Sequence, residues 1–333
     1  MSPRVDGRGW PGGPGRRISR YSRRGPPGQA GRGAGETAGN DGRRRLINGD
    51  AAGREEWSVE FLKWLVLRST PEFLLWRLKA SHYVRFLRSL PPSAEPEFGP
   101  VSSLVGPGDS AVDVGANFGM YTRLLSVRVG PGGEVHSFEP VPHTFRVLAS
   151  CVSKLRMTNV RLYPLALSDR AGEAVMTSPF YREGGSNYYK ARIAESGGGA
   201  GPGRRYPVRL RRMDDVLAGA RGPIRFIKID VEGHELPVLR GAGEVLARWK
   251  PALLVEVSRD PDDPSSTGAE LFRLLEGHGY GAYRLSEGRL IRRAPGDRAV
   301  NYFFLTPSQA EQAAGSEAAG AAAPPGAPPT GGR

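Results

Sequence analysis

The segment Asp113-Val-Gly-Ala-Asn-Phe-Gly119 follows a short apolar run and precedes an amphipathic stretch. An apolar strand, a glycine-bearing turn and a helix form the first unit of a doubly wound α/β sheet, where ligands bind at the turn. Gly115 and Gly119 permit a tight turn and the close approach of a ligand, and Asn117 tolerates unusual turn dihedral angles. The segment therefore predicts a ligand-binding turn at the carboxyl end of the first strand.

Short apolar runs alternate with amphipathic stretches from Ser110 onward. This alternation is typical of a parallel sheet that is covered by helices on both faces. The expected strands are Ala111–Val114, Glu134–Phe138, Val160–Leu167, Ile224–Ile229 and Ala252–Val257, with Tyr280–Leu285 and Tyr302–Leu305 as a terminal antiparallel hairpin. The expected helices are Met120–Val129, His143–Leu155 and Gly268–Gly277. The sequence predicts a doubly wound α/β fold with a mostly parallel, seven-stranded sheet.

The two ends of the chain lack this alternation. Residues 1–50 are rich in Gly, Pro and Arg, and residues 309–333 are rich in Ala, Gly and Pro. Segments of this kind cannot bury enough apolar surface to offset the entropy of ordering. We expect a disordered arm at the first end and a disordered tail at the second.

Between these ends we expect a helical extension over residues 55–92 and one domain over residues 100–308. In the extension, aromatic and aliphatic residues recur at intervals of three and four, which predicts two helices broken near Thr70-Pro71. Interleaved basic residues would also suit a membrane-surface helix, but packing on the main domain is the preferred interpretation. The interval Gly172 to Pro207 is predicted to be a long loop with a short strand at Ala174–Thr177, and such loops commonly contact substrate.

The formal net charge of +13 first suggests a polyanionic partner. Residues 1–50, however, hold eleven arginines against four acidic residues, which leaves only +6 for the other 283 residues. A uniformly basic face is not required, and we expect no stable nucleic-acid partner. The single cysteine excludes a disulfide framework, and neither a transmembrane run nor an apolar leader is visible. These features favour a soluble, cytoplasmic protein.

Acidic residues end the first two predicted strands. Asp113 opens a loop spaced Asp-x-Gly-x-x-x-Gly, which differs from the Gly-x-Gly-x-x-Gly of dinucleotide-binding turns. A carboxylate there disfavours phosphate but suits the amino group and sulfonium of S-adenosylmethionine. Glu139 lies twenty residues after Gly119, where an acid can accept hydrogen bonds from both ribose hydroxyls. The predicted cofactor is S-adenosylmethionine, and its predicted contacts are Asp113, Gly115, Asn117, Gly119 and Glu139, with Ser168 and Asp169 as candidates for the adenine amino group.

Further motifs follow this loop in a fixed order. They are Asp-Val-Gly-Ala-Asn-Phe-Gly-Met-Tyr-Thr at 113–122, Phe-Glu-Pro at 138–140, Ala-Leu-Ser-Asp at 166–169, Met-Asp-Asp-Val-Leu at 213–217, Ile-Lys-Ile-Asp-Val-Glu-Gly-His-Glu at 227–235 and Leu-Val-Glu at 254–256. Together they resemble the FkbM-type methyltransferases from about Gly108 to Ser258. The resemblance implies a class I, Rossmann-like methyltransferase fold, S-adenosylmethionine as methyl donor, and a usual preference for hydroxyls of sugars and secondary metabolites.

Methyl transfer to a hydroxyl is an in-line displacement, so alignment and a proton acceptor both assist it. Asp230 ends the fourth predicted strand, Glu232 and His234 lie in the following turn, and Glu256 ends the fifth strand. These four residues are the predicted catalytic group. His234 is the preferred base because its reference pKa is about 6.5. Asp230 is expected to support cofactor or acceptor, and Glu232 to bind substrate or orient His234.

Three alternatives stay open beside this interpretation. Asp230, Glu232 and Glu256 could gather a magnesium ion, although no metal-ligand spacing requires one. The protein could be a binding module for RNA or anionic membrane that uses the basic arm. It could also be a nicotinamide-dependent oxidoreductase. The preferred function is O-methylation of a small hydroxylated or glycosylated metabolite.

Overall fold

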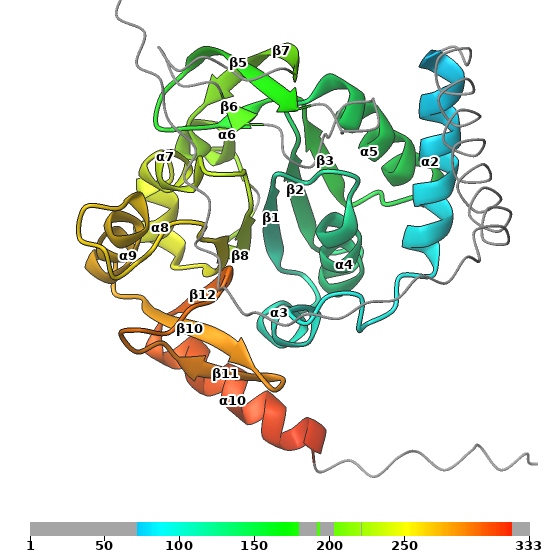
Figure 1. Ribbon diagram of the computed structural model, residues 1–333. Coiled ribbons are helices and arrows are strands. Elements are labelled where there is room, and N and C mark those ends of the chain that lie inside the picture. Colours follow the sequence, from blue (N-terminus) through cyan, green and yellow to red (C-terminus); the bar gives the residue numbers. More distant parts are fainter. Residues whose placement is uncertain (1–71, 180–191, 194–202, 221, 322–333) are drawn as a thin grey trace, which may run out of the picture. The chain divides into compact units, whose positions relative to one another are not determined.

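The computed structural model describes residues 72–179, 192–193, 203–220 and 222–321 (Figure 1). Within these residues the main sheet has eight strands in the order β11-β10-β12-β9-β8-β1-β2-β3. The strands are β1 (Ser110–Val114), β2 (Glu134–Phe138), β3 (Val160–Tyr163), β8 (Ile224–Ile229), β9 (Ala252–Glu256), β10 (Gly281–Ser286), β11 (Arg289–Arg292) and β12 (Asn301–Leu305). The strands from β9 to β3 pair in parallel, whereas β12, β10 and β11 are antiparallel. The predicted α/β fold with a mostly parallel sheet is confirmed.

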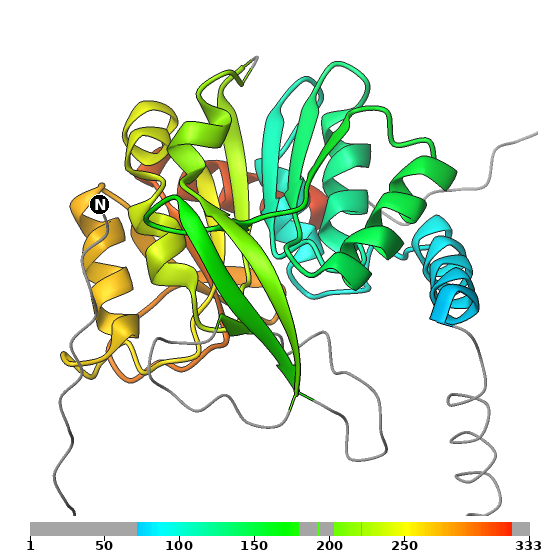
Figure 2. The same cartoon turned by 90° about the horizontal axis from the view of Figure 1, so that it is seen from above.

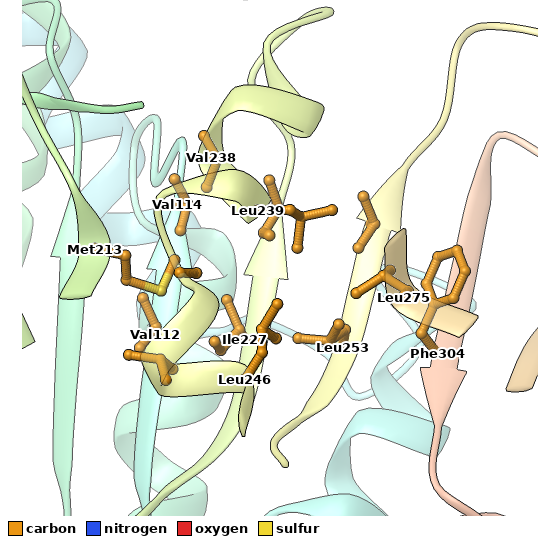
Figure 3. Close-up of a cluster of buried hydrophobic side chains, with 14 of the residues drawn as sticks. Val112, Val114, Met213, Ile227, Val238, Leu239, Leu246, Leu253, Leu275 and Phe304 are labelled. Carbon is orange, nitrogen blue, oxygen red and sulfur yellow. The ribbon is translucent and has the colours of Figure 1, made fainter. Parts of the chain in front are cut away.

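Helices cover both faces of this sheet because alternate side chains of the central strands are buried on opposite faces. Val112 and Val114 of β1 join a cluster on one face, whereas Ala111 joins a cluster on the other. The first face is covered by α6 (Met213–Leu217), α7 (Glu235–Arg240), α8 (Gly243–Trp249) and α9 (Thr267–Gly277), whose buried side chains Figure 3 shows against the strands. The second face is covered by α3 (Phe98–Leu104), α4 (Met120–Val129) and α10 (Pro307–Ala321).

Helix α2 (Glu72–Arg88) lies beside α5 (Pro142–Lys154) (Figure 1). Its buried side chains, Val84 and Leu87 among them, pack with Val147 and with Phe118 of the loop after β1. The helix therefore reaches the ligand-binding turn predicted from the sequence. The first of the two helices predicted within residues 55–92 lies outside the described residues.

A second sheet has the order β4-β7-β5-β6 in the described part of the chain. Its strands are β4 (Ala166–Leu167), β5 (Gly172–Pro179), β6 (Arg192–Ile193) and β7 (Gly203–Arg211). Strands β5 and β7 pair antiparallel along their length and run side by side in Figure 2. The interval 172–207, which we predicted to be mainly loop, thus contains long strands at both of its ends. Residues 180–191 and 194–202 of that interval lie outside the described residues.

One predicted strand boundary is corrected, and one strand is added. The third strand was predicted to continue from Val160 to Leu167, but it ends at Tyr163 and Ala166–Leu167 belongs to the second sheet. Pro164 separates the two pieces and lacks the amide hydrogen that a ladder requires. The predicted antiparallel pairing of Tyr280–Leu285 with Tyr302–Leu305 is confirmed, because β10 pairs with β12, but an additional strand, β11, was not predicted. Strand β10 forms its hairpin with β11, and β12 lies between β10 and β9, which gives eight strands where seven were predicted.

Helix α10 occupies most of the segment that we expected to be a disordered tail. The side chain of Ala313 is buried on the sheet, and the Gln312 side-chain amide donates to the Ser103 carbonyl at 3.0 Å. The amide of Gln309 donates to the Lys250 carbonyl at 2.7 Å. These tertiary contacts hold a helix that its Ala- and Gly-rich sequence did not predict. Among the described helices, none is long and apolar enough to cross a membrane.

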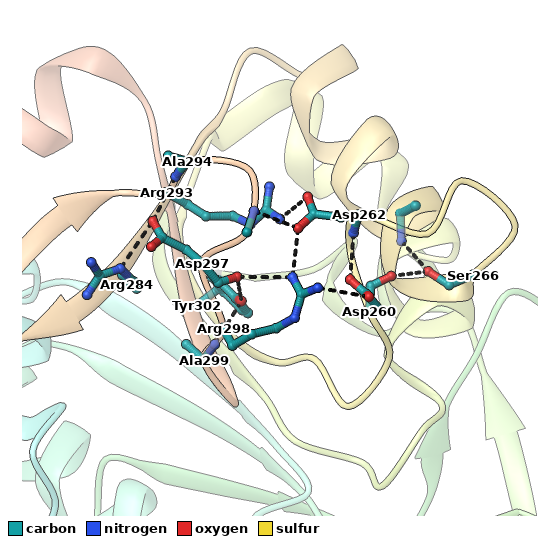
Figure 4. A network of polar contacts seen from close by, with 12 residues as sticks. Asp260, Asp262, Ser266, Arg284, Arg293, Ala294, Asp297, Arg298, Ala299 and Tyr302 are labelled. Carbon is teal, nitrogen blue, oxygen red and sulfur yellow. Dashed lines mark hydrogen bonds and ion pairs between the residues drawn. The ribbon is translucent and has the colours of Figure 1, made fainter.

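An ion-pair network joins the segment after β9 to the segment before β12 (Figure 4). Asp262 accepts from Arg298 at 2.7 Å and from the Gly296 amide at 2.8 Å, and it also pairs with Arg293. Arg298 reaches Asp260 at 3.0 Å. The hydrogen bonds from Arg293 and Arg298 hold the pKa of Asp262 below its usual range. The network fixes the start of β12, where Asn301 lies opposite Glu256 of β9.

Candidate functional site

The loop between β1 and α4 has the left-handed backbone that its composition predicted. The φ angles of Gly115, Asn117 and Gly119 are 75°, 49° and 98°. A Cβ atom at Gly115 would lie 1.9 Å from the carbonyl oxygen of Asp230, so the first glycine lets β1 and β8 approach at their carboxyl ends. The amides of Gly115 and Ala116 donate to the Phe138 carbonyl at 3.0 and 2.9 Å. The loop is therefore tied to both neighbouring strands.

Glu139 follows β2 and is almost fully buried beside this loop. Its carboxylate accepts from the Asn117 amide at 3.0 Å and from the Val141 amide at 2.9 Å. Burial raises the pKa of Glu139 to about 7, although the two amides and Lys228 oppose the rise. Each carboxylate oxygen keeps a second lone pair for a ligand donor. The geometry therefore leaves Glu139 able to accept hydroxyl hydrogen bonds, and its contact with the ribose stays a prediction.

A cavity of about 780 Å³, open to solvent, lies over these strand ends. Of the predicted residues, it is lined by Gly115, Asn117, Glu139, Asp230, Glu232 and His234. Its apolar lining includes Phe138, Val141, Leu165, Leu167 and, from the second sheet, Met176. The buried Oδ1 atom of Asn117 has no hydrogen-bond partner among the described residues. We call this the first cavity.

Asp113 does not line the first cavity. Its side chain is fully buried, with Oδ2 accepting from Thr122 at 2.6 Å and Oδ1 lying 3.8 Å from Lys228 Nζ. Burial raises the pKa of the Asp113 carboxyl, while Lys228 and Thr122 oppose the rise. The structure thus places Asp113 behind the loop, where it orients the loop through Lys228 and Thr122.

Lys228 connects Asp113, the loop and Asp230. Its buried Nζ atom lies 3.2 Å from Asp230 Oδ2, donates to the Gly115 carbonyl at 3.3 Å and lies 5.1 Å from the Tyr121 ring centroid. Burial alone would lower the pKa of Lys228, but Asp230 and Asp113 outweigh burial and raise it. Lys228 is therefore charged, and sequence reasoning missed it. The available signal was one lysine within the otherwise apolar end of a buried strand, Phe226-Ile-Lys-Ile229.

Asp230 and Glu256 form a pair of carboxyl groups at the ends of β8 and β9. Burial raises the pKa of Glu256 to about 8, and the neighbouring Asp230 carboxylate adds to the rise. Burial would also raise the pKa of Asp230, but Lys228 and a hydrogen bond from Glu256 lower it below its usual value. Near neutral pH the pair therefore holds one proton on Glu256 and one negative charge on Asp230.

The structure brings His234 together with Ser168. His234 Nε2 lies 3.0 Å from Ser168 Oγ, and Ser168 Oγ lies 3.2 Å from Asp169 Oδ1. Burial lowers the pKa of His234 below its usual value, although Asp169 opposes this effect. Glu232 has a φ angle of 56° in the turn between β8 and α7, and it lines the first cavity with His234. A neutral imidazole thus lies on the side of the cavity where the adenine contacts were predicted.

No group of three or more His, Cys, Asp or Glu side chains is placed to hold a metal ion in the described parts of the chain. The arrangement of Asp230, Glu232 and Glu256 therefore has no geometric support as a magnesium site. Lys228 lies closest to the pair and supplies the positive charge next to Asp230.

The residues of the first cavity fit S-adenosylmethionine. Apolar side chains provide faces for a purine, Glu139 provides an acceptor for ribose hydroxyls, and the unpartnered Asn117 oxygen accepts from an amino group. The cavity lies outside the carboxyl ends of β1 and β8, where the strand order reverses. The fold is that of a class I, Rossmann-like methyltransferase.

Comparisons with known proteins agree with this class. The Methyltransferase FkbM domain matches residues 113–281, and the chain belongs to this family. The 31-O-demethyl-FK506 methyltransferase FkbM of Streptomyces tacrolimicus is 32% identical over 52% of this chain and 73% of its own length. Methyltransferase sdnD of Sordaria araneosa is 28% identical over 51% of this chain and 72% of its own length. The predicted family and the predicted cofactor, S-adenosylmethionine, are confirmed.

Solved structures give more distant matches. The methyltransferase FkbM of Methylobacillus flagellatus KT aligns with a TM-score of 0.39 and 15% identity. That alignment covers 76% of this chain and 60% of the other chain. A SAM-dependent O-methyltransferase of Thermotoga maritima aligns with a TM-score of 0.35 and 13% identity, over 63% of this chain and 64% of the other.

Proposed function

We propose that this methyltransferase transfers the methyl group to a hydroxyl oxygen of a sugar or secondary metabolite. The observation that carries the proposal is the position of Asp230, a carboxylate with a lowered pKa in the lining of the first cavity. A hydroxyl hydrogen-bonded to this carboxylate is oriented and has a proton acceptor within reach. The Streptomyces tacrolimicus relative is named as a methyltransferase of 31-O-demethyl-FK506, and this name supports an oxygen atom as the methyl acceptor.

The S-adenosylmethionine that binds here supplies an electrophilic methyl group on a sulfonium. The acceptor oxygen forms a bond to the methyl carbon, the carbon–sulfur bond breaks, and its electron pair stays on sulfur. The hydroxyl proton passes to an Asp230 oxygen. Once the new carbon–oxygen bond has formed, the proton on that oxygen is far more acidic than a carboxylic acid. A carboxylate with a lowered pKa can therefore accept it late in the reaction.

The remaining predicted residues take supporting roles in this proposal. Glu256 keeps its proton and donates a hydrogen bond to Asp230, which holds the carboxylate in one orientation. His234, which we predicted to be the base, is proposed to position Ser168 on the cofactor side. Asp169 and Glu232 are proposed to contact the cofactor from the same side. Asp113 and Gly119 are proposed to act by shaping the loop.

The test is transfer of labelled methyl from S-adenosylmethionine to a panel of hydroxylated metabolites. We expect a product whose label resists alkali, as an ether does and an ester does not. Asp230→Asn should lower kcat by about 100-fold or more with little change in the dissociation constant of S-adenosylhomocysteine. Asp215→Asn, at an exposed carboxylate of α6 that lines neither cavity, is the matched control and should change kcat far less. Label that alkali releases, or full turnover by Asp230→Asn, would contradict the proposal.

A further inference from the structure

A second cavity, of about 890 Å³ and also open to solvent, lies on the other side of the loop after β1. It shares Gly115, Asn117 and Asp230 with the first cavity. A ligand in each cavity would therefore meet at Asp230. This adjacency is what methyl transfer requires of donor and acceptor sites, because the reacting atoms must lie within about 3 Å to 3.5 Å.

Aromatic side chains form much of the wall of the second cavity. Tyr83 and Phe86 come from α2, and Phe118 and Tyr121 come from the loop and α4. The rings of Tyr83 and Phe118 stack with their centroids 4.1 Å apart. The faces of aromatic rings attract cations as well as apolar groups, with an energy of about 0.5 to 2 kcal/mol per contact.

The charged groups around this cavity are mainly acidic. Glu95 and Asp230 line it, and Glu97 is buried close by, where it accepts from Asn301 at 2.8 Å. Burial raises the pKa of Glu95, and Glu97 and Asp230 add to the rise while Lys228 opposes it. The neighbouring carboxylates thus repel one another electrostatically, and a cation bound in the cavity would reduce this repulsion.

Two lysines oppose this negative charge only in part. Lys228 lines the cavity, but Asp113 and Asp230 both lie within 4 Å of its Nζ atom. Lys79 of α2 lies 5.7 Å from the Phe118 ring centroid and does not line the cavity, and burial lowers its pKa. Among the residues that the structure describes, Glu95 and Glu97 therefore leave the cavity with an excess of negative charge.

We propose that the second cavity is the acceptor site, and that the acceptor carries a protonated amine on an apolar skeleton beside the hydroxyl that is methylated. This inference rests on the proposed O-methyl transfer. The ammonium group donates to Glu95 and lies against the aromatic rings, while the hydroxyl points to Asp230. A protonated amine has no free electron pair, so the hydroxyl oxygen is the nucleophile.

Part of the second cavity lies outside the family match. Tyr83, Phe86 and Glu95 precede residue 113, and Asn301 follows residue 281. The lining of the first cavity, in contrast, lies entirely within the matched residues. The ammonium partner Glu95 and two of the aromatic rings therefore come from α2 and the segment after it.

Tyramine and N-acetyltyramine are suitable probes because they differ in the charge of one amine. Their binding to the full chain, saturated with S-adenosylhomocysteine, would be measured by calorimetry. We expect tyramine to bind at least ten-fold more tightly than N-acetyltyramine. Glu95→Gln should reduce that ratio below about three-fold, whereas Phe86→Ala should weaken both probes. Glu276→Gln, on the exposed end of α9, is the matched control and should leave the ratio unchanged.

Equal affinity for the two probes would overturn the inference, as would an unchanged ratio in a folded Glu95→Gln protein. Failure of tyramine to bind at millimolar concentration would also overturn it. Thermal unfolding of each variant establishes that the protein is folded. A different result would contradict the proposed function, namely that S-adenosylhomocysteine binds but no hydroxylated metabolite is methylated. Methylation of neutral alcohols, with no preference for amines, would remove this inference and leave the proposed function intact.

Discussion

Gly115→Ala is expected to abolish measurable binding of S-adenosylhomocysteine and to lower the free energy of unfolding by about 3 to 5 kcal/mol. The new Cβ atom would lie 1.9 Å from the Asp230 carbonyl oxygen, so β1 and β8 would have to separate at their carboxyl ends. The left-handed backbone conformation at this position destabilises alanine relative to glycine by a further ~1 to 2 kcal/mol. Denaturant unfolding and calorimetry measure the two effects.

Gly108→Ala is the matched control for this prediction. Gly108 has a φ angle of 85°, close to that of Gly115, but a Cβ atom there would meet nothing within 4 Å. It should therefore lose only the backbone contribution of about 1 to 2 kcal/mol and keep its affinity for S-adenosylhomocysteine. Equal losses in the two variants would show that the contact with Asp230 is not what requires glycine at position 115.

Lys228→Met should be the most damaging substitution of a charged residue in the described structure. It removes the cation from between Asp113 and Asp230, and leaving a buried charge without its partner costs about 3 to 5 kcal/mol. Arg225→Met, on the same strand, is the control because Arg225 is exposed and pairs with Asp109 at 3.7 Å. The control should change the free energy of unfolding by less than about 1 kcal/mol.

A second substitution separates charge from packing in this prediction. Asp113→Asn in the Lys228→Met background removes one of the two unpaired charges, so it should recover part of the lost stability. The same Asp113→Asn change in the otherwise native protein should be destabilising. If the two changes were additive, Lys228 would stabilise the protein by packing alone, and its proposed role in fixing the loop through Asp113 would be wrong.

Local sequence patterns predicted much of the fold. The strands Glu134–Phe138 and Ile224–Ile229 and the helix Met120–Val129 have the predicted bounds, because apolar period and turn residues agree there. The prediction errors, at the end of the third strand and at β11, arose where the pairing of a strand with its neighbours determines the structure. Strand β11 has two arginines among its four residues and is recognisable chiefly by the left-handed Glu287-Gly288 turn before it.

The sequence predicted those residues of the candidate site that lie at the carboxyl ends of the parallel strands. Glu139, Asp230 and Glu256 each follow or end a parallel strand, and the carboxyl ends of such strands meet at one edge. The face of the sheet to which a side chain points is harder to predict from the sequence. Asp113 and Lys228 point to the face covered by α4, so Asp113 lies behind the loop, where the sequence had suggested a direct cofactor contact.

The second cavity could not have been predicted from local patterns. It combines α2, the loop after β1 and β12, and the hydrogen bond between Glu97 and Asn301 joins residues that are 204 positions apart. The hydrophobic periodicity of the sequence around Glu97 or around Asn301 does not indicate that contact. The aromatic residues of α2 were interpreted as packing residues, whereas Phe86 is exposed and lines a cavity together with Tyr83.

We propose that the methyl donor occupies the first cavity and leaves the second free for the acceptor. Amide hydrogen exchange with and without saturating S-adenosylhomocysteine tests this claim most directly. We predict slower exchange in residues 114–119, 138–141 and 165–168, with little change along Glu72–Arg88 of α2. Protection of α2 without protection of residues 138–141 would place the donor in the second cavity and contradict the account.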